Sequence, residues 1–164
     1  MTSGPTYTPI ATTNLGSASS YTFTSIPQTY TDLILIINDV ANTSTNQGVY
    51  LLYNNDSGSN YSRTGLRANG STASSFYQSN NPQLALGAAG STNNPKPNIA
   101  HIMNYSNTTT YKTTLSRGND AGNGLDAMVH LWRNTAAITS IAIYENTATF
   151  STNATATLYG IASA

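Results

Sequence analysis

The C-terminal quarter of the chain has the clearest pattern of apolar and polar positions. Within it, Met128 and Trp132 fall on one face of an alternating run and Val129 on the other, which is the two-residue period of a β-strand. Neither face is clearly polar, so we expect these strands to be central and covered on both sides. The three predicted strands in this region are Ala127–Arg133, Ala137–Tyr144 and Ala154–Ile161.

The same alternation recurs along the rest of the chain. It is strongest in Thr31–Asn38, where Leu33 and Leu35 face away from Ile34, as in strands buried between two layers. Roughly ten short strands at about 8–14-residue spacing, with no amphipathic helix pattern, predict an antiparallel sandwich or barrel. The other predicted strands are Ile10–Leu15, Tyr21–Thr24, Val49–Tyr53, Tyr61–Arg67, Ser75–Gln78, Gln83–Leu86, Ile99–Tyr105 and Tyr111–Ser116.

Length and composition indicate a single all-β domain. The 164 residues are enough for one sizeable core. Only 7% of them are charged, but 38% are hydrophobic and are gathered into runs of the length of a strand. The absence of cysteine excludes disulfides and thiolate metal sites. The start lacks the pattern of a signal peptide, and the longest apolar run, Leu33–Ile37, is too short to span a bilayer, so we expect synthesis in the cytoplasm.

The first nine residues are polar and contain two prolines, so we expect an extended arm (1–9) ahead of a sandwich domain (10–164). A frayed terminus and an arm that docks on a neighbour fit this segment equally well. On the second interpretation its residues are the candidate partner-binding residues: Met1, Thr2, Ser3, Gly4, Pro5, Thr6, Tyr7, Thr8 and Pro9.

The charges argue against a nucleic-acid or membrane partner. The formal net charge is zero and the six Lys and Arg residues are scattered along the chain. Binding to phosphate backbones, or to an anionic membrane surface, needs clustered cations.

No group of residues stands out as a catalytic centre, and we expect no cofactor. A glycosidase needs two carboxylates that face each other across the scissile bond. None of the six acids is marked as such a pair by its context, and Asp56 and Asp120 lie in glycine-containing turns, where Asp serves the backbone. A hydrolase with a carboxylate pair is therefore a weak alternative.

Three binding alternatives remain weaker than their structural explanations. His101 and His130 either meet on one sheet and hold a metal, or serve as core or interface side chains, which we favour. The segment Asn54–Asn60 has the spacing of a calcium loop without its closing glutamate, so a hairpin turn is the better interpretation. Trp132 and the tyrosines suit a core or subunit interface better than a sugar-stacking platform.

Several segments resemble small virion structural proteins of tailed bacteriophages, and the resemblance runs from about Tyr7 to the end of the chain. Periodicity does not separate a jelly roll from another Greek-key sandwich, but this family consists of β-sandwiches that are often jelly rolls. The resemblance rests on Ser25–Leu33, Tyr53–Ser62, Leu131-Trp132-Arg133, Thr135–Ile141, Phe150 and Thr157–Ile161.

The resemblance implies a non-enzymatic protein of the virion. We expect a capsid decoration, or cement, protein that binds the major capsid protein or other virion proteins, as a homotrimer. The alternative is a tail-fibre or receptor-binding domain that recognises host surface glycan through loops such as Gly87–Asn98. A weakly charged surface suits dense packing of like copies in either location.

Overall fold

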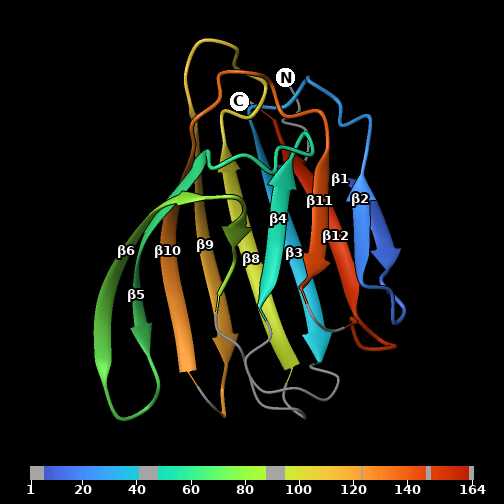
Figure 1. Ribbon diagram of the computed structural model, residues 1–164. Helices are drawn as coiled ribbons and strands as arrows, with labels where there is room; N and C mark the ends of the chain where they lie inside the picture. Colours follow the sequence, from blue (N-terminus) through green and yellow to red (C-terminus); the bar gives the residue numbers. More distant parts are fainter. Residues whose placement is uncertain (1–5, 41–47, 88–94, 123, 147–148, 163–164) are drawn as a thin grey trace.

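The computed structural model describes residues 6–40, 48–87, 95–122, 124–146 and 149–162. These residues contain twelve strands and no helix, arranged as two antiparallel sheets packed face to face (Figure 1). The predicted all-β sandwich is therefore confirmed. Within the described residues, no helix has the length and apolar character needed to cross a membrane.

The two sheets differ in width. The larger has eight strands, in the order β1 (Tyr7–Asn14), β12 (Thr155–Ile161), β3 (Asp32–Val40), β8 (Pro95–Met103), β9 (Lys112–Asp120), β10 (Gly124–Trp132), β5 (Tyr61–Ala68) and β6 (Ala73–Asn81). The smaller has four, in the order β2 (Ser20–Phe23), β11 (Ile141–Glu145), β4 (Val49–Tyr53) and β7 (Leu84–Ala85). The smaller sheet lies in front of β3, β8 and β12, and the larger extends past it on one side (Figure 1).

The chain passes back and forth between the sheets. Strands β1 to β4 alternate between the larger and the smaller sheet, and β7, β8, β11 and β12 do the same. The β5–β6 and β9–β10 hairpins interrupt this alternation and form the side of the larger sheet that extends past the smaller one. The fold is therefore a sandwich in which most connections cross from one sheet to the other, with two hairpins added to the larger sheet.

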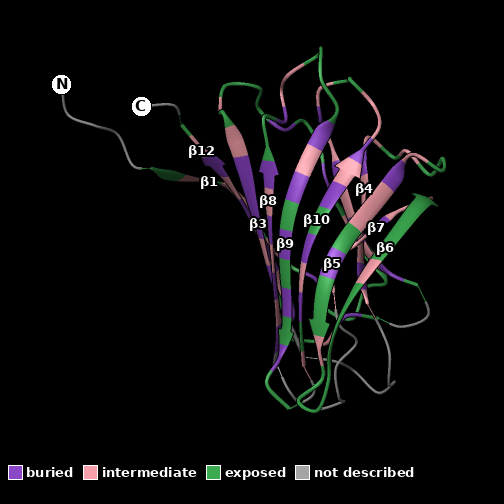
Figure 2. Cartoon of the chain, turned by 90° about the vertical axis from the view of Figure 1, so that its left-hand side faces the viewer, coloured by how far each residue is buried: buried purple, intermediate pink, exposed green. Residues whose placement is uncertain are grey.

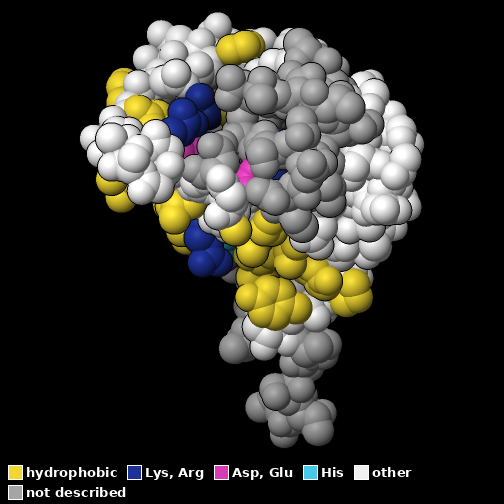
Figure 3. Space-filling model, turned by 90° about the horizontal axis from the view of Figure 1, so that it is seen from below, with side chains coloured by type: hydrophobic (Ala, Val, Ile, Leu, Met, Phe, Trp, Pro, Cys, Tyr) yellow, Lys and Arg dark blue, Asp and Glu magenta, His cyan; other side chains and the backbone are white. Residues whose placement is uncertain are grey.

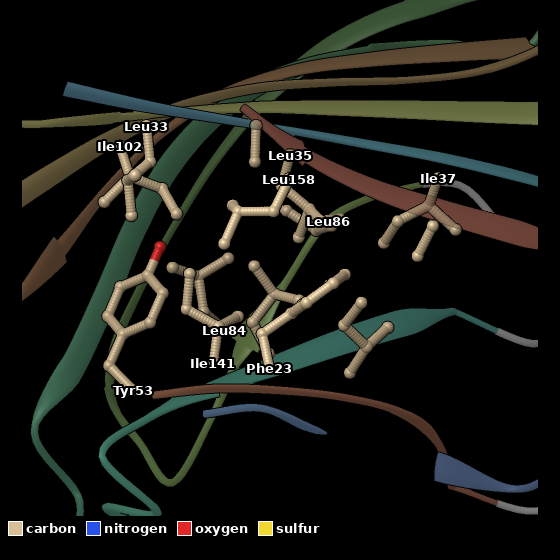
Figure 4. Close-up of a cluster of buried hydrophobic side chains, with 14 of the residues drawn as sticks. Phe23, Leu33, Leu35, Ile37, Tyr53, Leu84, Leu86, Ile102, Ile141 and Leu158 are labelled. Atoms are coloured by element: carbon tan, nitrogen blue, oxygen red, sulfur yellow. The ribbon is translucent and has the colours of Figure 1, made fainter. Parts of the chain in front are cut away.

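The core lies between the sheets, where alternate residues of facing strands interdigitate (Figure 4). The larger sheet contributes Leu33, Leu35 and Leu158, and the smaller contributes Phe23 and Ile141. All five are at most 3% exposed. At about 1.5–3 kcal/mol for each fully buried large apolar side chain, this cluster is the main favourable contribution to folding.

The expectation that both faces of the C-terminal strands are covered is wrong for β10. One face carries the buried Met128 and Trp132, but on the other face Val129 is 42% and Leu125 47% exposed. Apolar alternation without a polar face does not distinguish a covered strand from one whose second face is left open.

Strand β11 begins four residues later than the run Ala137–Tyr144 predicts. The segment before it is held by the side chain of Asn54, whose Nδ2 donates to Ala137 O at 2.8 Å and whose Oδ1 accepts from Thr139 N at 2.8 Å. Ile138 in that segment is fully buried. Isolated backbone hydrogen bonds add to the Asn54 contacts, among them Ile138 N to Tyr105 O at 2.9 Å. The apolar pattern there reflects core packing without a strand ladder, because a side-chain amide and scattered backbone partners satisfy the backbone.

The expected N-terminal arm overlaps the sheet. Strand β1 begins at Tyr7, so Tyr7, Thr8 and Pro9 pair with β12, while residues 1–5 lie outside the described residues. Proline is tolerated there because β1 is an edge strand, and the pairing register shifts between Pro9 and Ala11. Pro9, near the polar N-terminal end of the chain, thus lies in an edge strand at a β-bulge.

Gly160 gives the first test of this packing. A Cβ built on Gly160 would lie 2.3 Å from Cγ of the Tyr30 ring. We expect Gly160→Ala to lower the free energy of unfolding by about 1–3 kcal/mol, because the ring must shift from a packed position. Urea unfolding followed by the fluorescence of Trp132, the sole tryptophan, measures this.

The control is the same change in a Tyr30→Ala background. There the cost of Gly160→Ala should fall, because the clashing ring is gone. An equal cost in both backgrounds would contradict the proposed contact.

Candidate functional site

The outer face of the larger sheet carries two neighbouring rows of mostly apolar side chains. Strand register sets the rows, because residues opposite each other in adjacent strands point to the same face. The first row is Tyr159, Ile34, His101, Leu115, Val129, Thr64 and Tyr77. The second is Thr157, Ile36, Ile99, Arg117, Ala127, Leu66 and Ser75.

Large apolar side chains on this face remain in contact with solvent. Tyr77 is 68%, Leu66 63% and Leu115 46% exposed. The outer face of a two-layer sandwich is ordinarily polar, since water covers it. A contiguous apolar area of this kind on an exposed face is typical of an interaction site.

The rows surround an open hollow of about 820 Å³. Its apolar lining comes mainly from β3, β8, β9, β10 and β5. Its polar members are His101, Arg117 and the hydroxyl residues Thr64, Ser75 and Ser116. Seen from below, hydrophobic side chains gather along the lower margin of the molecule, with Lys or Arg side chains beside them (Figure 3). Tyr7 also lines the hollow, and it is the member of the predicted partner-binding segment that the structure places there.

Polar groups on the outer face are few and partly paired. His101 Nε2 lies 2.8 Å from Asp32 Oδ2, and Asp32 Oδ1 accepts a hydrogen bond from Asn104 N at 2.6 Å. Arg117, in the second row, adds one exposed cation. This face is therefore suited to apolar contact with a few directional polar contacts at specific positions.

The inner face of the extending strands is unusually polar for the inside of a sandwich. Arg67 makes two parallel hydrogen bonds to the fully buried Asp126, Nε to Oδ1 at 2.7 Å and Nη2 to Oδ2 at 2.8 Å. These contacts raise the pKa of Arg67. Lys112 is 1% exposed, and its Nζ donates to Thr110 O at 2.7 Å and Thr135 O at 3.0 Å. Each charged group has a partner, as burial requires.

The two histidines do not meet. His101 points to the outer face, while His130 is buried on the inner face, 2.8 Å from Ser116 Oγ. The metal site considered for this pair is thus wrong. The core explanation is confirmed for His130, while His101 is partly exposed on the outer face and its place in an interface stays a prediction. Burial, with the charge of Arg63 nearby, lowers the pKa of His130 to about 3, so its imidazole is neutral at ordinary pH.

The Asn54–Asn60 segment is a turn organised around one carboxylate. Asp56 accepts hydrogen bonds from Trp132 Nε1 at 2.7 Å, Asn60 Nδ2 at 2.9 Å and Gly58 N at 2.9 Å. Burial alone would raise the pKa of Asp56, but these hydrogen bonds outweigh it and lower the pKa. Donors surround the oxygens that a calcium ion would need, so the segment is a turn and not a calcium loop. The hairpin part of the interpretation is wrong, because the turn joins β4 in the smaller sheet to β5 in the larger one and the two strands do not pair.

The aromatic residues considered for sugar stacking are largely internal. Trp132 is 1% exposed and stacks on Tyr61 with ring centroids 6.4 Å apart, while Tyr53 meets it edge-on at 5.6 Å. Tyr105 is also fully buried, whereas Tyr111 is 52% exposed. The expectation that Trp132 belongs to the core is confirmed.

Sequence reasoning missed the outer face as a site. The signal was present, because Leu115, Val129 and Leu66 lie at alternate positions of strands whose other positions are also partly apolar. The alternation around Val129 predicts coverage on both faces, and nothing around Leu115 or Leu66 predicts an exposed apolar face. Among the described residues, no three His, Asp, Glu or Cys side chains lie close enough together to hold a metal ion.

Comparison with known proteins does not assign a family. No family model matches the chain, and no curated protein matches it in sequence. The functional argument therefore rests on the geometry of this chain.

The buried imidazole predicts a pH dependence of stability. The unfolded chain binds a proton at His130 near pH 6.5 and the folded chain does not until about pH 3. Its contribution to the free energy of unfolding is thus present above pH 6.5 and is lost as the pH falls toward 3, by up to about 1.4 kcal/mol per pH unit. Urea unfolding at several pH values measures the slope, and His130→Gln should make it shallower. An unchanged slope in that variant would contradict the assignment.

The Asp56 turn gives a second test. Asp56→Ala removes charge-assisted hydrogen bonds to Trp132, Asn60 and Gly58, so we expect the free energy of unfolding to fall by about 2 kcal/mol. Thermal unfolding of the wild type should be the same with added calcium or with a chelator. A calcium-dependent increase in melting temperature that Asp56→Ala abolishes would restore the cation-site hypothesis.

Proposed function

We propose that the protein is a non-enzymatic structural protein of a bacteriophage virion, which decorates the assembled capsid and adheres to it through the outer face of the larger sheet. The observation that carries this proposal is the pair of exposed apolar rows on a broad, regular sheet. A binding face built on strands is held rigidly before contact, so little conformational entropy is lost on binding.

We also propose that the sandwich is a jelly roll with two added hairpins. The order β1-β12-β3-β8 in one sheet and β2-β11-β4-β7 in the other supports this, because consecutive strands of this set of eight lie in opposite sheets. Eight strands that form two four-stranded layers are the jelly-roll arrangement, which capsid proteins commonly use.

The surface chemistry fits attachment in many copies. A decoration protein binds the assembled shell and stabilises it by mass action, so it needs complementary shape and avidity rather than bond chemistry. With a formal net charge of zero, neighbouring copies do not repel one another over long distances. The homotrimer implied by the resemblance remains a prediction, as does a role for the residues that precede β1.

Binding to capsids assembled without this protein tests the proposal. We expect the purified wild type to co-sediment with them, and the double variant Leu66→Asp with Leu115→Asp to bind at least about tenfold more weakly. Each leucine buried at an interface contributes about 1.5–3 kcal/mol, which a charged side chain forfeits.

The matched control is Thr22→Asp with Thr24→Asp, exposed positions at the smaller sheet, which should bind like the wild type. Deleting residues 2–5 tests the arm without removing any of β1. Wild-type protein that fails to bind capsids would overturn the proposal. If the labelled protein is found only on the tail of intact virions, the receptor-binding alternative is favoured. The loop assigned to glycan binding, Gly87–Asn98, falls largely outside the described residues, with Pro95–Asn98 in β8.

A further inference from the structure

Strand β6 is an open edge of the larger sheet. It runs from Ala73 to Asn81, and among the described residues no strand lies beyond it. Its residues are exposed except for Phe76 and Asn81, and it lies at the outer margin of the sandwich (Figure 2). An edge of this kind presents a row of backbone N–H and C=O groups that a further strand can pair with.

The other three edges are blunted in ways that β6 is not. Strand β1 carries Pro9 and a register shift, β2 has four residues and β7 has two. Strand β6 contains no proline and no charged residue, and it pairs with β5 in unbroken register from Ala73 to Gln78. Natural sheets use proline, charge, bulges or short length to prevent edge pairing. The bulge of β6 lies between Gln78 and Asn81, so the regular stretch 73–78 is free of these devices and is suited to edge pairing.

We infer that β6 pairs antiparallel with β6 of a second copy of this chain about a two-fold axis, joining the two larger sheets into one continuous sheet. Each copy then offers the same strand to the other, which is the self-complementary contact of a two-fold dimer. The inference goes beyond the proposed function and replaces the homotrimer that the resemblance implies with a pair of copies. It does not depend on capsid binding, since the two copies pair or fail to pair without any capsid.

Symmetry restricts the register of this pairing. A two-fold axis normal to the sheet keeps each face on the same side, so opposite residues differ by an even number and one residue must face its own copy. The largest overlap of the regular stretch 73–78 that this rule allows is five residues, which places that residue at Ser75 or Phe76. In both registers, Ser75 of one copy lies opposite Ser75 or Tyr77 of the other.

The side chains near the axis favour a second copy as the occupant. Like-with-like pairing of an uncharged strand opposes no equal charges. The nearest cations, Arg63 and Arg67, lie one strand back on β5, where Arg63 Nε donates to Gln78 Oε1 at 2.8 Å and Arg67 is paired with Asp126. Both guanidinium groups also sit over the Phe76 ring, 5.4 and 5.3 Å from its centroid, on the inner face.

The same pairing also buries apolar surface on the outer face. Tyr77 and Leu66, the two most exposed large apolar side chains on the apolar rows, lie at the β6 end of those rows. Pairing brings Tyr77 and Leu66 of one copy close to the same residues of the other copy near the axis. Their apolar surface is then partly buried, and the rows of the two copies become continuous. The joined sheet presents one apolar face across two molecules.

Sedimentation analysis of the full chain, with two charge variants, tests this inference. The first variant is Ser75→Lys with Tyr77→Lys and the second is Ser75→Glu with Tyr77→Glu, both at exposed positions. We expect the wild type to have the mass of two copies and each variant alone the mass of one, because like charges then face each other across the axis. An equal mixture of the two variants should recover the two-copy mass.

Thr12→Lys with Asn14→Lys, exposed positions on the opposite edge strand β1, is the matched control and should remain paired. Circular dichroism and melting temperature verify that each variant is folded. Amide hydrogen exchange adds a readout specific to the edge, with alternate amides of 73–78 exchanging more slowly in the wild type than in the lysine variant.

A single-copy or three-copy wild type would overturn the inference, and so would charge variants that stay paired. A two-copy mass with no slowing of exchange at β6 would also overturn it, because the contact would lie elsewhere. Capsid binding is measured separately, so a failure of edge pairing leaves the proposed function standing, and the reverse also holds.

Discussion

The sheet of eight strands is wider than the sheet of four that packs against it, and this inequality governs the rest of the molecule. The smaller sheet covers one part of the larger, where the leucines of β3 and β12 meet Phe23 and Ile141. The β5–β6 and β9–β10 hairpins extend past that cover. Trp132 and Tyr61, at one end of β10 and β5, still belong to the shared apolar core. The rest of these strands must be satisfied by other means on both faces.

On the inner face the means are polar. Asp126 and His130 lie in the rows that hold Ile37 and Leu33 in β3, and Lys112 lies at the start of β9 beyond those rows. Each is buried with a hydrogen-bonding partner. Such pairs contribute less net stability than apolar packing, because much of their attraction is offset by desolvation. They fix which residues stand opposite one another, since a shifted strand would leave buried charges without partners.

On the outer face the cover is absent within the described residues, and apolar side chains remain exposed in two rows. The same widening places β6 at the outer margin of the larger sheet, as an edge without proline or charge. The open face and the open edge thus share one origin, and both suit contact with other molecules through shape and backbone pairing. That is the physical basis for proposing adhesion as the work of this chain.

The sequence by itself determined the all-β class, the existence of nearly every strand, the core position of Trp132 and the role of Asn54–Asn60 as a turn. Alternation with a period of two and turn residues are local properties, readable from neighbours in the chain. Tertiary structure alone decided that His101 and His130 lie on opposite faces, that Ile138 is buried without a strand, and that Val129 and Leu115 face solvent. These outcomes depend on which strands lie beside and above one another, and an apolar residue carries the same local signal whether a second layer covers it or leaves it open.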